Sequence, residues 1–238
     1  MEKTQLQETK GVILVSIVVP VYNEEGSIRS LHEEIVRMCD SPSGLSVPAE
    51  WEIIFVDDGS TDSTPQICSQ LEPLKYIRMD RNSGQTAALD RGFKEAQGDY
   101  IAALDGDGQN DPADIPRLLQ YLIDNDLDAV SGWRKIRHDS LRKKAASRGA
   151  YLMRQILVKD GIRDSGCTLK VYRKECFRDL TLIKDQHRFI PAILKAHGFR
   201  VGEMVVNHRP RLKGESKYNY KRLRNGLRDL IDIWRNMR

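Results

Sequence analysis

The sequence predicts an α/β protein built on a mostly parallel β-sheet with helices on both faces. Three observations lead to this prediction. Short β-branched apolar runs alternate with segments that have apolar residues at helical spacing. The longest run, VILVSIVVPVY, is continuous, as expected for a strand buried on both faces. Acidic residues follow several of these runs, at the edge of a parallel sheet where ligands bind.

Each element has its own local signal. The segment after the first strand places Ile28, Leu31, Ile35 and Met38 on one helical face, and Pro65 fits the first turn of a further helix. The predicted order is strand 12–22, helix 23–39, strand 51–58, helix 60–71, strand 76–79, helix 84–96, strand 100–105 and helix 114–125.

Composition bounds the class of protein. A chain of 238 residues suffices for one sizeable domain, or for one domain with an appendage. Its four cysteines lack Cys-x-x-Cys pairing and zinc-ligand spacing, which favours buried, reduced thiols in the cytosol. The longest apolar run is too short to span a bilayer and is interrupted by Ser16, so we expect a soluble chain.

Charge is divided unevenly along the chain. Residues 1–133 hold 10 Lys and Arg against 24 Asp and Glu, whereas residues 134–238 hold 28 against 10. The two halves therefore face different partners. Within the basic half, residues 134–148 carry seven Lys and Arg against the single acid Asp139. The tail 221–238 spaces apolar residues along one helical face flanked by arginines, a pattern of a membrane-surface helix or of a helix packed on the core.

The motif DGDGQNDP follows the strand at 100–105. In an extended segment Asp105 and Asp107 would point the same way and repel each other unless a cation lay between them. Gly106 and Gly108 allow unusual backbone geometry, and Gln109 adds an oxygen suited to a hard cation. The motif therefore indicates a divalent metal site, with a solvated turn as the alternative.

Other carboxylates follow the first two strands, namely Glu24, Glu25, Asp57 and Asp58. The chain contains neither a Gly-x-Gly-x-x-Gly motif after the first strand nor a P-loop, so the phosphates of a nucleotide need another counter-charge. A metal at the Asp-x-Asp motif supplies it. The earlier carboxylates remain available for hydroxyl groups of a ribose or sugar and for donors on a base.

These motifs resemble, in content and order, the family 2 inverting glycosyltransferases of the GT-A fold. More narrowly, they resemble the branch of dolichol-phosphate mannosyltransferases and polyprenyl-phosphate glycosyltransferases. The resemblance covers residues 15 to about 220 and rests on VSIVVPVYNEE, IIFVDDGSTDST, RNSGQTAALDRGF, GDYIAALDGDGQNDP, DSGCTLKVYR, HRF and RPRLKGESKY.

The resemblance implies roles for individual residues. The catalytic residues would be Asp105, Asp107 and Asp164, with Asp164 orienting the reacting sugar. Asp105, Asp107 and Gln109 would hold Mg²⁺ or Mn²⁺ with the donor diphosphate. The donor site would comprise Pro20, Tyr22, Glu24, Asp58, Asp105, Arg211 and Lys217, and the acceptor site Arg134, Arg142, Ser147 and Arg188. The alternatives are structural: Tyr22 packs on the sheet, Asp58 caps a helix beginning near Ser60, and Asp164 belongs to a turn.

The implied reaction is the inverting transfer of a hexose from GDP-mannose or a UDP-sugar to a polyprenyl or dolichyl phosphate. The expected organisation is a leader (1–14), a catalytic domain (15–220) with a nucleotide-binding half (about 15–133) and an acceptor-binding half (about 134–220), and an amphipathic tail (221–238). We expect a peripheral protein on the cytoplasmic face of an anionic membrane, which relies on that surface, on an integral partner or on a membrane anchor beyond this sequence.

The chain departs from the pattern of this family at four positions. Relatives often carry a bulkier residue where this chain has Gly106 and Gly108, and a Gly-Phe pair where it has Cys167 and Thr168, so the donor sugar is left open.

Rival functions also remain. A nucleotide-sugar or polyanion-binding adaptor is the non-catalytic alternative. A haloacid-dehalogenase-like phosphatase, with Asp105 as its nucleophile, is the weaker enzymatic one. The basic half has no recognisable nucleic-acid-binding motif, so we expect no nucleic-acid partner.

Overall fold

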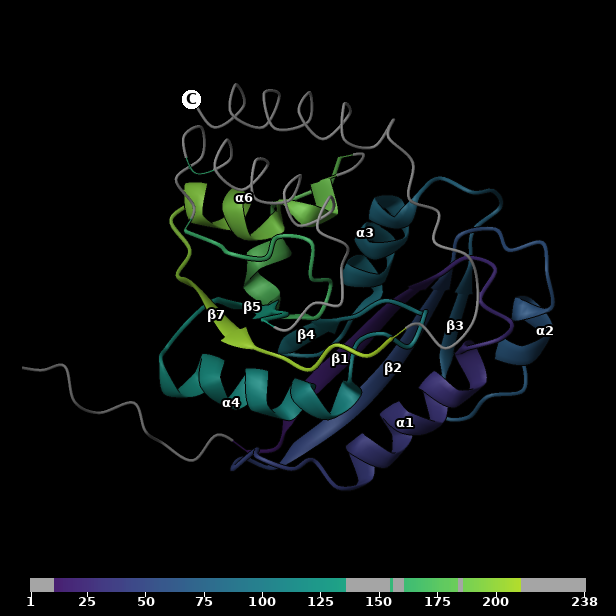
Figure 1. Ribbon diagram of the computed structural model, residues 1–238, viewed down its shortest axis with the longest axis horizontal. Coiled ribbons are helices and arrows are strands. Elements are labelled where there is room, and N and C mark those ends of the chain that lie inside the picture. The colour runs from purple at the N-terminus through teal and green to yellow at the C-terminus, as the bar shows by residue number, and fades with distance from the viewer. Residues whose placement is uncertain (1–10, 136–154, 156–160, 184–185, 211–238) are drawn as a thin grey trace, which may run out of the picture.

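A computed structural model describes residues 11–135, 155, 161–183 and 186–210 of the chain (Figure 1). Its strands form one seven-stranded sheet in the order β3-β2-β1-β4-β6-β5-β7. The strands are β1 (Ile13–Val21), β2 (Ala49–Asp57), β3 (Lys75–Arg78), β4 (Tyr100–Ala103), β5 (Ala129–Trp133), β6 (Lys170–Arg173) and β7 (Val201–Val205). The helices are α1 (Ile28–Asp40), α2 (Thr64–Cys68), α3 (Gln85–Glu95), α4 (Ile115–Asp124) and α6 (Ile190–Ala196), with short 3-10 turns η1 (Pro112–Asp114), η2 (Lys174–Phe177) and η3 (Gln186–Arg188).

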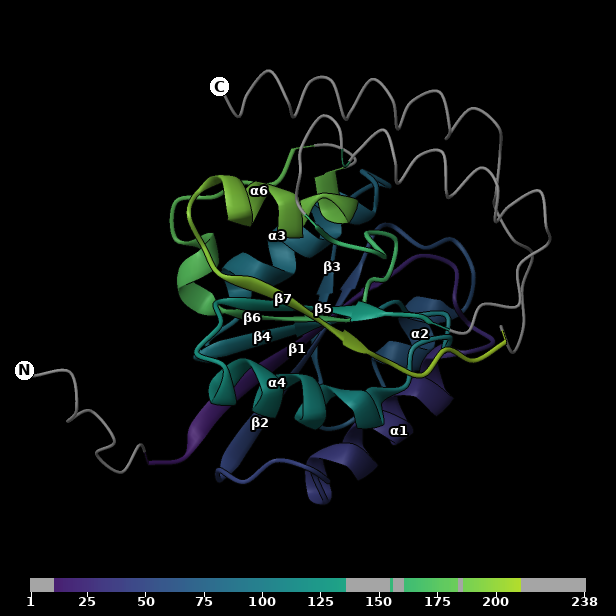
Figure 2. The same cartoon turned by 60° about the vertical axis from the view of Figure 1, so that its left-hand side comes forward.

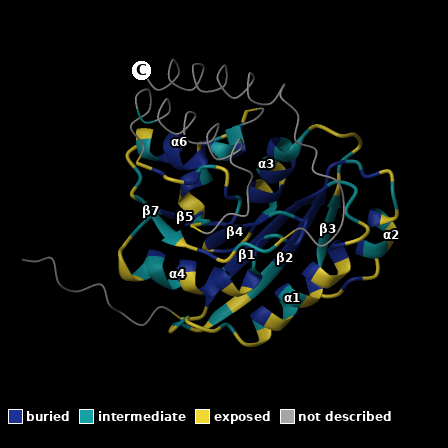
Figure 3. Cartoon of the chain, in the orientation of Figure 1, coloured by how far each residue is buried: buried dark blue, intermediate teal, exposed yellow. Residues whose placement is uncertain are grey.

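Helices cover both faces of the sheet (Figures 1 and 2). On one face, Val15, Ile17 and Val19 of β1 pack with apolar residues of α1 and α4. On the other face, Val18 of β1 and Val56 of β2 pack with α3 and α6. β4 is buried throughout, and β1 is buried except at Leu14 (Figure 3). The predicted fold class is therefore confirmed, and the alternation of strands and helices has the cause inferred from the sequence, since a sheet that is apolar on both faces needs cover on both.

The sheet is mixed at one position. β1, β2, β3 and β4 pair in parallel, whereas β6 runs antiparallel between β4 and β5. In this register Ala103 of β4 pairs with Lys170 of β6. Because β6 and β7 come from the expected acceptor half, the two halves share one sheet.

The boundaries differ from the sequence-based ones mainly in three places. The helix predicted at 23–39 begins at Ile28. The helix predicted at 60–71 is reduced to five residues, Thr64–Cys68. The strand predicted at 100–105 ends at Ala103, so the Asp-x-Asp motif lies in a turn. Cys68, Cys167 and Cys176 are buried and Cys39 is partly buried, all as free thiols. Among the described residues, the helices are too short or too polar to cross a bilayer.

Candidate active site

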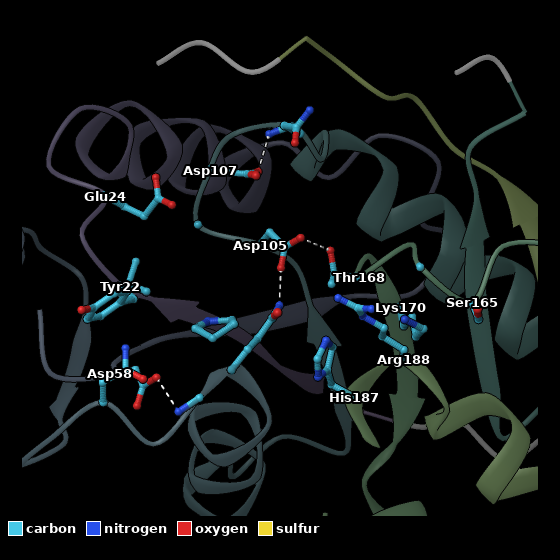
Figure 4. Close-up of a pocket in the computed structure, with 18 residues that line it drawn as sticks. Tyr22, Glu24, Asp58, Asp105, Asp107, Ser165, Thr168, Lys170, His187 and Arg188 are labelled. Atoms are coloured by element: carbon cyan, nitrogen blue, oxygen red, sulfur yellow. Dashed lines mark hydrogen bonds between the residues drawn. The ribbon is translucent and has the colours of Figure 1, made fainter. Parts of the chain in front are cut away.

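A cavity of about 490 Å³ opens beyond the carboxyl ends of β1, β2 and β4 (Figure 4). Most of the predicted site residues that the structure describes line it: Pro20, Tyr22, Glu24, Asp58, Asp105, Asp107, Gln109 and Arg188. Its wall also contains residues that the sequence analysis did not assign: Val21, Asn82, Gly84, Gln85, Gly106, Ser165, Gly166, Thr168, Lys170 and His187.

The loop after β1 is connected to the Asp-x-Asp loop. Ser27 Oγ donates to Glu24 Oε2 at 2.9 Å and lies 3.0 Å from the carbonyl oxygen of Gly106. Gly106 fits here because it has no side chain: a Cβ at this position would lie 2.8 Å from Val21 Cγ1. Substitution of Gly106 by a larger residue would therefore push the two loops apart.

Asp58 holds the start of α3. It is buried, and its two carboxylate oxygens accept hydrogen bonds from the backbone N–H groups of Ser83 and Gly84, at 2.6 and 2.8 Å. The alternative that Asp58 caps a helix near Ser60 is wrong, because Asp57 accepts the Ser60 N–H bond instead. Asp58 thus shapes the cavity and lines it at the same time.

The Asp-x-Asp motif forms a turn instead of extending the strand, so our premise of an extended segment is wrong, although Asp105 and Asp107 line the same cavity. Asp107 Oδ1 accepts the backbone N–H of Gln109 at 3.1 Å, which closes the turn, and Gly108 has a φ of 73°, where glycine is favoured. Asp105 and Asp107 therefore differ in their partners (Figure 4).

Asp105 is fixed by two neighbours. Gln85 Nε2 donates to its Oδ1 at 2.6 Å, and Thr168 Oγ1 donates to its Oδ2 at 2.7 Å. Burial and the charge of Asp107 raise the pKa of Asp105, while the hydrogen bond of Thr168 and the charges of Lys170 and Arg134 oppose this rise. Asp105 is therefore a positioned carboxylate whose oxygens are both engaged by protein donors.

Two oxygen-bearing side chains in the cavity wall, those of Asp107 and Gln109, fit a divalent cation. Among the described residues, no group of three or more His, Cys, Asp or Glu side chains could hold a metal by itself. Asp107 and Gln109 both line the cavity and offer oxygen ligands. Mg²⁺ is commonly held by one or two carboxylates together with substrate phosphates, so these two residues suit an ion that a bound diphosphate completes.

Asp164 and Arg134 bind each other. Arg134 Nε and Nη2 lie 2.7 and 2.9 Å from the two carboxylate oxygens of Asp164, which is 5% exposed. Burial lowers the pKa of Arg134, but the hydrogen bond and charge of Asp164 outweigh it and raise that pKa above its ordinary value. Neither residue lines the cavity, although the adjacent Ser165 and Gly166 do.

Lys170, Thr168 and His187 were missed as site residues. The signal was their position in the DSGCTLKVYR and HRF motifs, but their placement depends on the pairing of β4 with β6. That register places Thr168 opposite Asp105, beyond the end of β4. His187 Nδ1 lies 2.8 Å from Thr86 Oγ1, which fastens η3 to α3.

The remaining predicted residues, Arg142, Ser147, Arg211 and Lys217, lie outside the described residues. The chain leading toward Arg211 is anchored at Arg209. Its side chain forms ion pairs with Glu34 at 2.5 Å and Asp111 at 2.7 Å, and its backbone N–H donates to the carbonyl oxygen of Gln109. The RPRLKGESKY segment therefore starts beside the Asp-x-Asp loop.

A cavity at the carboxyl ends of parallel strands is the usual ligand site of an open α/β sheet, and comparison with known proteins identifies the family. Residues 16–181 match the family described as glycosyl transferase family 2. The chain belongs to glycosyl transferase family 2, which confirms the predicted glycosyltransferase and removes the phosphatase alternative.

Named relatives narrow the comparison. A dodecaprenyl-phosphate galacturonate synthase of Rhizobium johnstonii is 40% identical over 234 residues, which cover 94% of this chain and 67% of that protein. An undecaprenyl-phosphate 4-deoxy-4-formamido-L-arabinose transferase of Salmonella choleraesuis is 36% identical over 222 residues, covering 91% of this chain and 66% of that protein. The chain thus spans about two thirds of the length of these relatives, and its similarity to the polyprenyl-phosphate branch is confirmed.

Solved structures share the fold. Glucosyl-3-phosphoglycerate synthase from Mycobacterium tuberculosis superimposes with a TM-score of 0.71 at 18% sequence identity, covering 94% of this chain and 80% of that chain. A second structure of that enzyme, in complex with Mn²⁺, UDP and glucosyl-3-phosphoglycerate, also has a TM-score of 0.71, at 17% identity. At this identity the likeness establishes the fold alone.

Proposed function

We propose that this protein transfers a sugar from a nucleotide sugar to a polyprenyl phosphate with inversion at the anomeric carbon. The observation that carries the proposal is the gathering of Glu24, Asp58, Asp105 and Asp107 in one cavity at the carboxyl ends of parallel strands. The similarity to polyprenyl-phosphate sugar transferases supports the acceptor class. The sugars named for those relatives differ, so hexose, hexuronate and aminopentose donors remain to be compared.

In the proposed site, Tyr22, Glu24 and Asp58 surround the base and ribose of the donor. Asp107 and Gln109 hold Mg²⁺ or Mn²⁺ with the donor diphosphate, and Asp105 positions the ribose or the metal shell from its place between Gln85 and Thr168. When bound, the metal offsets negative charge that develops on the leaving diphosphate.

The reaction is one direct displacement. An oxygen of the acceptor phosphate attacks the anomeric carbon while the bond from that carbon to the diphosphate oxygen breaks, and the bonding electrons leave with the nucleoside diphosphate. Because the second pKa of a phosphate monoester is about 6, the acceptor is largely dianionic at neutral pH and needs no general base. This fits Asp164, whose carboxylate is bound to Arg134 and serves to orient the neighbouring Ser165–Gly166 segment.

The basic half is proposed to dock on an anionic membrane at its cytoplasmic face and to bind the acceptor phosphate through Arg142 and Ser147, whereas Arg134, which was also expected there, is engaged by Asp164. At the end of β5, Arg163 lies over the Trp133 ring at 4.5 Å and Lys135 lies 6.0 Å from it, which places cations around an aromatic side chain where the basic segment begins. The tail 221–238 is proposed as a second membrane contact, and either an integral partner or an anchor beyond this sequence remains compatible with it.

A transfer assay tests the proposal. The purified protein is incubated with Mn²⁺, undecaprenyl phosphate and each of a set of labelled nucleotide sugars, and the label is measured in the organic phase. We expect one donor to give a lipid-linked product whose anomeric configuration is opposite to that of the donor. Donor binding without transfer to any polyprenyl or dolichyl phosphate would instead establish the adaptor.

A flotation assay tests membrane docking separately. Binding to liposomes should increase with anionic lipid and fall with salt. Alanine at Arg142, Lys143 and Lys144 should weaken it, since each basic residue contributes about 1 kcal/mol near an anionic leaflet. Alanine substitution of the exposed Arg37, Arg91 and Lys94 in the acidic half removes the same charge and serves as the control. Equal losses for both triple variants would contradict docking through the basic half.

A further inference from the structure

The cavity has two ends of opposite charge. Figure 4 shows Tyr22, Glu24 and Asp58 on one side and Lys170, His187 and Arg188 on the other, with Asp105 between them. If the base, ribose and diphosphate of the donor occupy the acidic end and the Asp107 region, as proposed above, the sugar extends toward the basic end. The chemistry of that end therefore bears on the class of sugar.

Lys170 is the cation in the wall that is most deeply buried. It is 2% exposed, and its Nζ donates a short hydrogen bond to the carbonyl oxygen of Cys167. Within the described residues, no carboxylate oxygen lies within 4.0 Å of this nitrogen. An ammonium group has three donors, so the Cys167 carbonyl engages one of them.

The carboxylates nearest to Lys170 are engaged elsewhere. Asp105 accepts hydrogen bonds from Gln85 and Thr168, and Asp164 accepts hydrogen bonds from Nε and Nη2 of Arg134. Burial lowers the pKa of Lys170, and the charge of Arg134 lowers it further. Electrostatic interactions with Cys167, Asp164 and Asp105 act in the opposite direction. A buried ammonium costs several kcal/mol when it lacks a close counter-charge, which favours a role in binding an anion.

Arg188 adds a second cation at the same end. It follows His187, whose bond to Thr86 fixes η3 against α3, and its side chain is partly exposed. Among the described residues it forms no ion pair. A neutral hexose offers these two cations hydroxyl groups alone, whereas a sugar acid offers a carboxylate that can form charge-assisted hydrogen bonds.

We propose that Lys170, assisted by Arg188, forms a subsite for the carboxylate of a hexuronic acid, so that the donor is a nucleoside diphosphate hexuronate. The inference rests on the proposed function and specifies its donor. The acceptor phosphate is another anion with the same chemistry, so the experiment must separate the carboxylate of the donor from the phosphate of the acceptor.

Two pairs of donors that differ at C6 alone provide the test. UDP-glucose is compared with UDP-glucuronate, and GDP-mannose with GDP-mannuronate, by titration calorimetry with Mn²⁺ and without lipid. For the base that the protein accepts, we expect the acid to bind about tenfold more tightly than its neutral partner, the effect of one charge-assisted hydrogen bond. Lys170→Met should abolish this preference while leaving the affinity for the free nucleoside diphosphate unchanged.

Arg188→Gln provides a second test in case the Lys170 variant misfolds, because Arg188 is partly exposed. This variant should reduce the preference for the acid over the neutral sugar severalfold. Arg178→Gln removes an exposed arginine outside the cavity wall and should leave it intact. Equal affinity of wild type for acid and neutral sugars, with a neutral sugar transferred to lipid, overturns the inference and keeps the proposed function. An unchanged preference in both variants, with a higher KM for polyprenyl phosphate, overturns it in favour of the acceptor. Absence of any transfer overturns the proposed function itself.

Discussion

The loops at residues 104–111 and 163–169 meet at the cavity, and each carries an aspartate of predicted function. In the first loop, Asp107 lies in the cavity wall. In the second, Asp164 lies behind the wall, bound through both oxygens to Arg134. The same residue type thus serves as a candidate ligand in one loop and as a structural anchor in the other, and the two positions differ in whether the aspartate lines the cavity or lies behind its wall in a bidentate pair with Arg134.

The largest expected effect concerns the first loop. Asp107→Asn removes the charge that we propose faces the donor diphosphate, and we expect transfer to fall by about 10²–10³-fold, as for the loss of a group that stabilises charge at a reacting centre. Wild-type activity should also vanish in excess EDTA and return with Mn²⁺. Initial rates measure both effects, and circular dichroism verifies the fold.

Asp124→Asn is the matched control, because this exposed carboxylate in α4 lies outside the cavity wall and should leave the rate unchanged. Wild-type rates in the Asp107 variant or in EDTA would remove the basis for treating the first loop as the metal-binding one.

The second loop should respond in stability more than in chemistry. Asp164→Asn leaves a buried guanidinium without its carboxylate, and we expect the free energy of unfolding to fall by about 3 kcal/mol. Adding Arg134→Gln should restore part of this loss, because the double variant no longer buries an unpaired charge. Urea denaturation of both single variants and of the double variant measures the coupling. Strictly additive losses would mean that the pair is not an energetic unit.

Much of this contrast lies beyond what the sequence alone predicts. The parallel strands β1, β2 and β4 are local apolar runs, so the carboxylates at their ends could be placed in one site in advance. By contrast, β6 has four residues and pairs with β4 and β5, which both lie far before it in the sequence. Its register with β4 determines that Thr168 meets Asp105 and that Lys170 enters the cavity wall, and such non-local pairing leaves no periodic signal. A turn at Asp105–Asp107 was only the alternative in the sequence analysis, because its geometry depends on a hydrogen bond from the backbone N–H of Gln109.

Thr168 joins the two loops, and its removal tests how much one depends on the other. Thr168→Val keeps the shape but deletes the hydroxyl that donates to Asp105, so we expect stability to fall by about 2 kcal/mol, the range for a hydrogen bond to a charged group. The KM for the donor should rise, because Asp105 loses one of its two fixed partners. Thr181→Val, at an exposed position, should change stability by less than about 0.5 kcal/mol. If the two variants behave alike, the loops are not coupled through this bond.

The smallest effects concern the segment that reaches the first loop from β7. Arg209 is tied to Glu34 and Asp111, but its side chain is 37% exposed, so Arg209→Gln should cost at most about 1 kcal/mol of stability. Arg211 and Lys217, farther along RPRLKGESKY, are predicted to close over the donor diphosphate. Arg211→Ala should therefore weaken donor binding and slow turnover, each roughly tenfold, through loss of a charge-assisted contact. Because the two arginines are two residues apart, the pair separates anchoring from binding: stability should respond at Arg209 and donor affinity at Arg211. Unchanged kinetics with both substrates in Arg211→Ala would leave the segment as a surface loop held in place by Arg209.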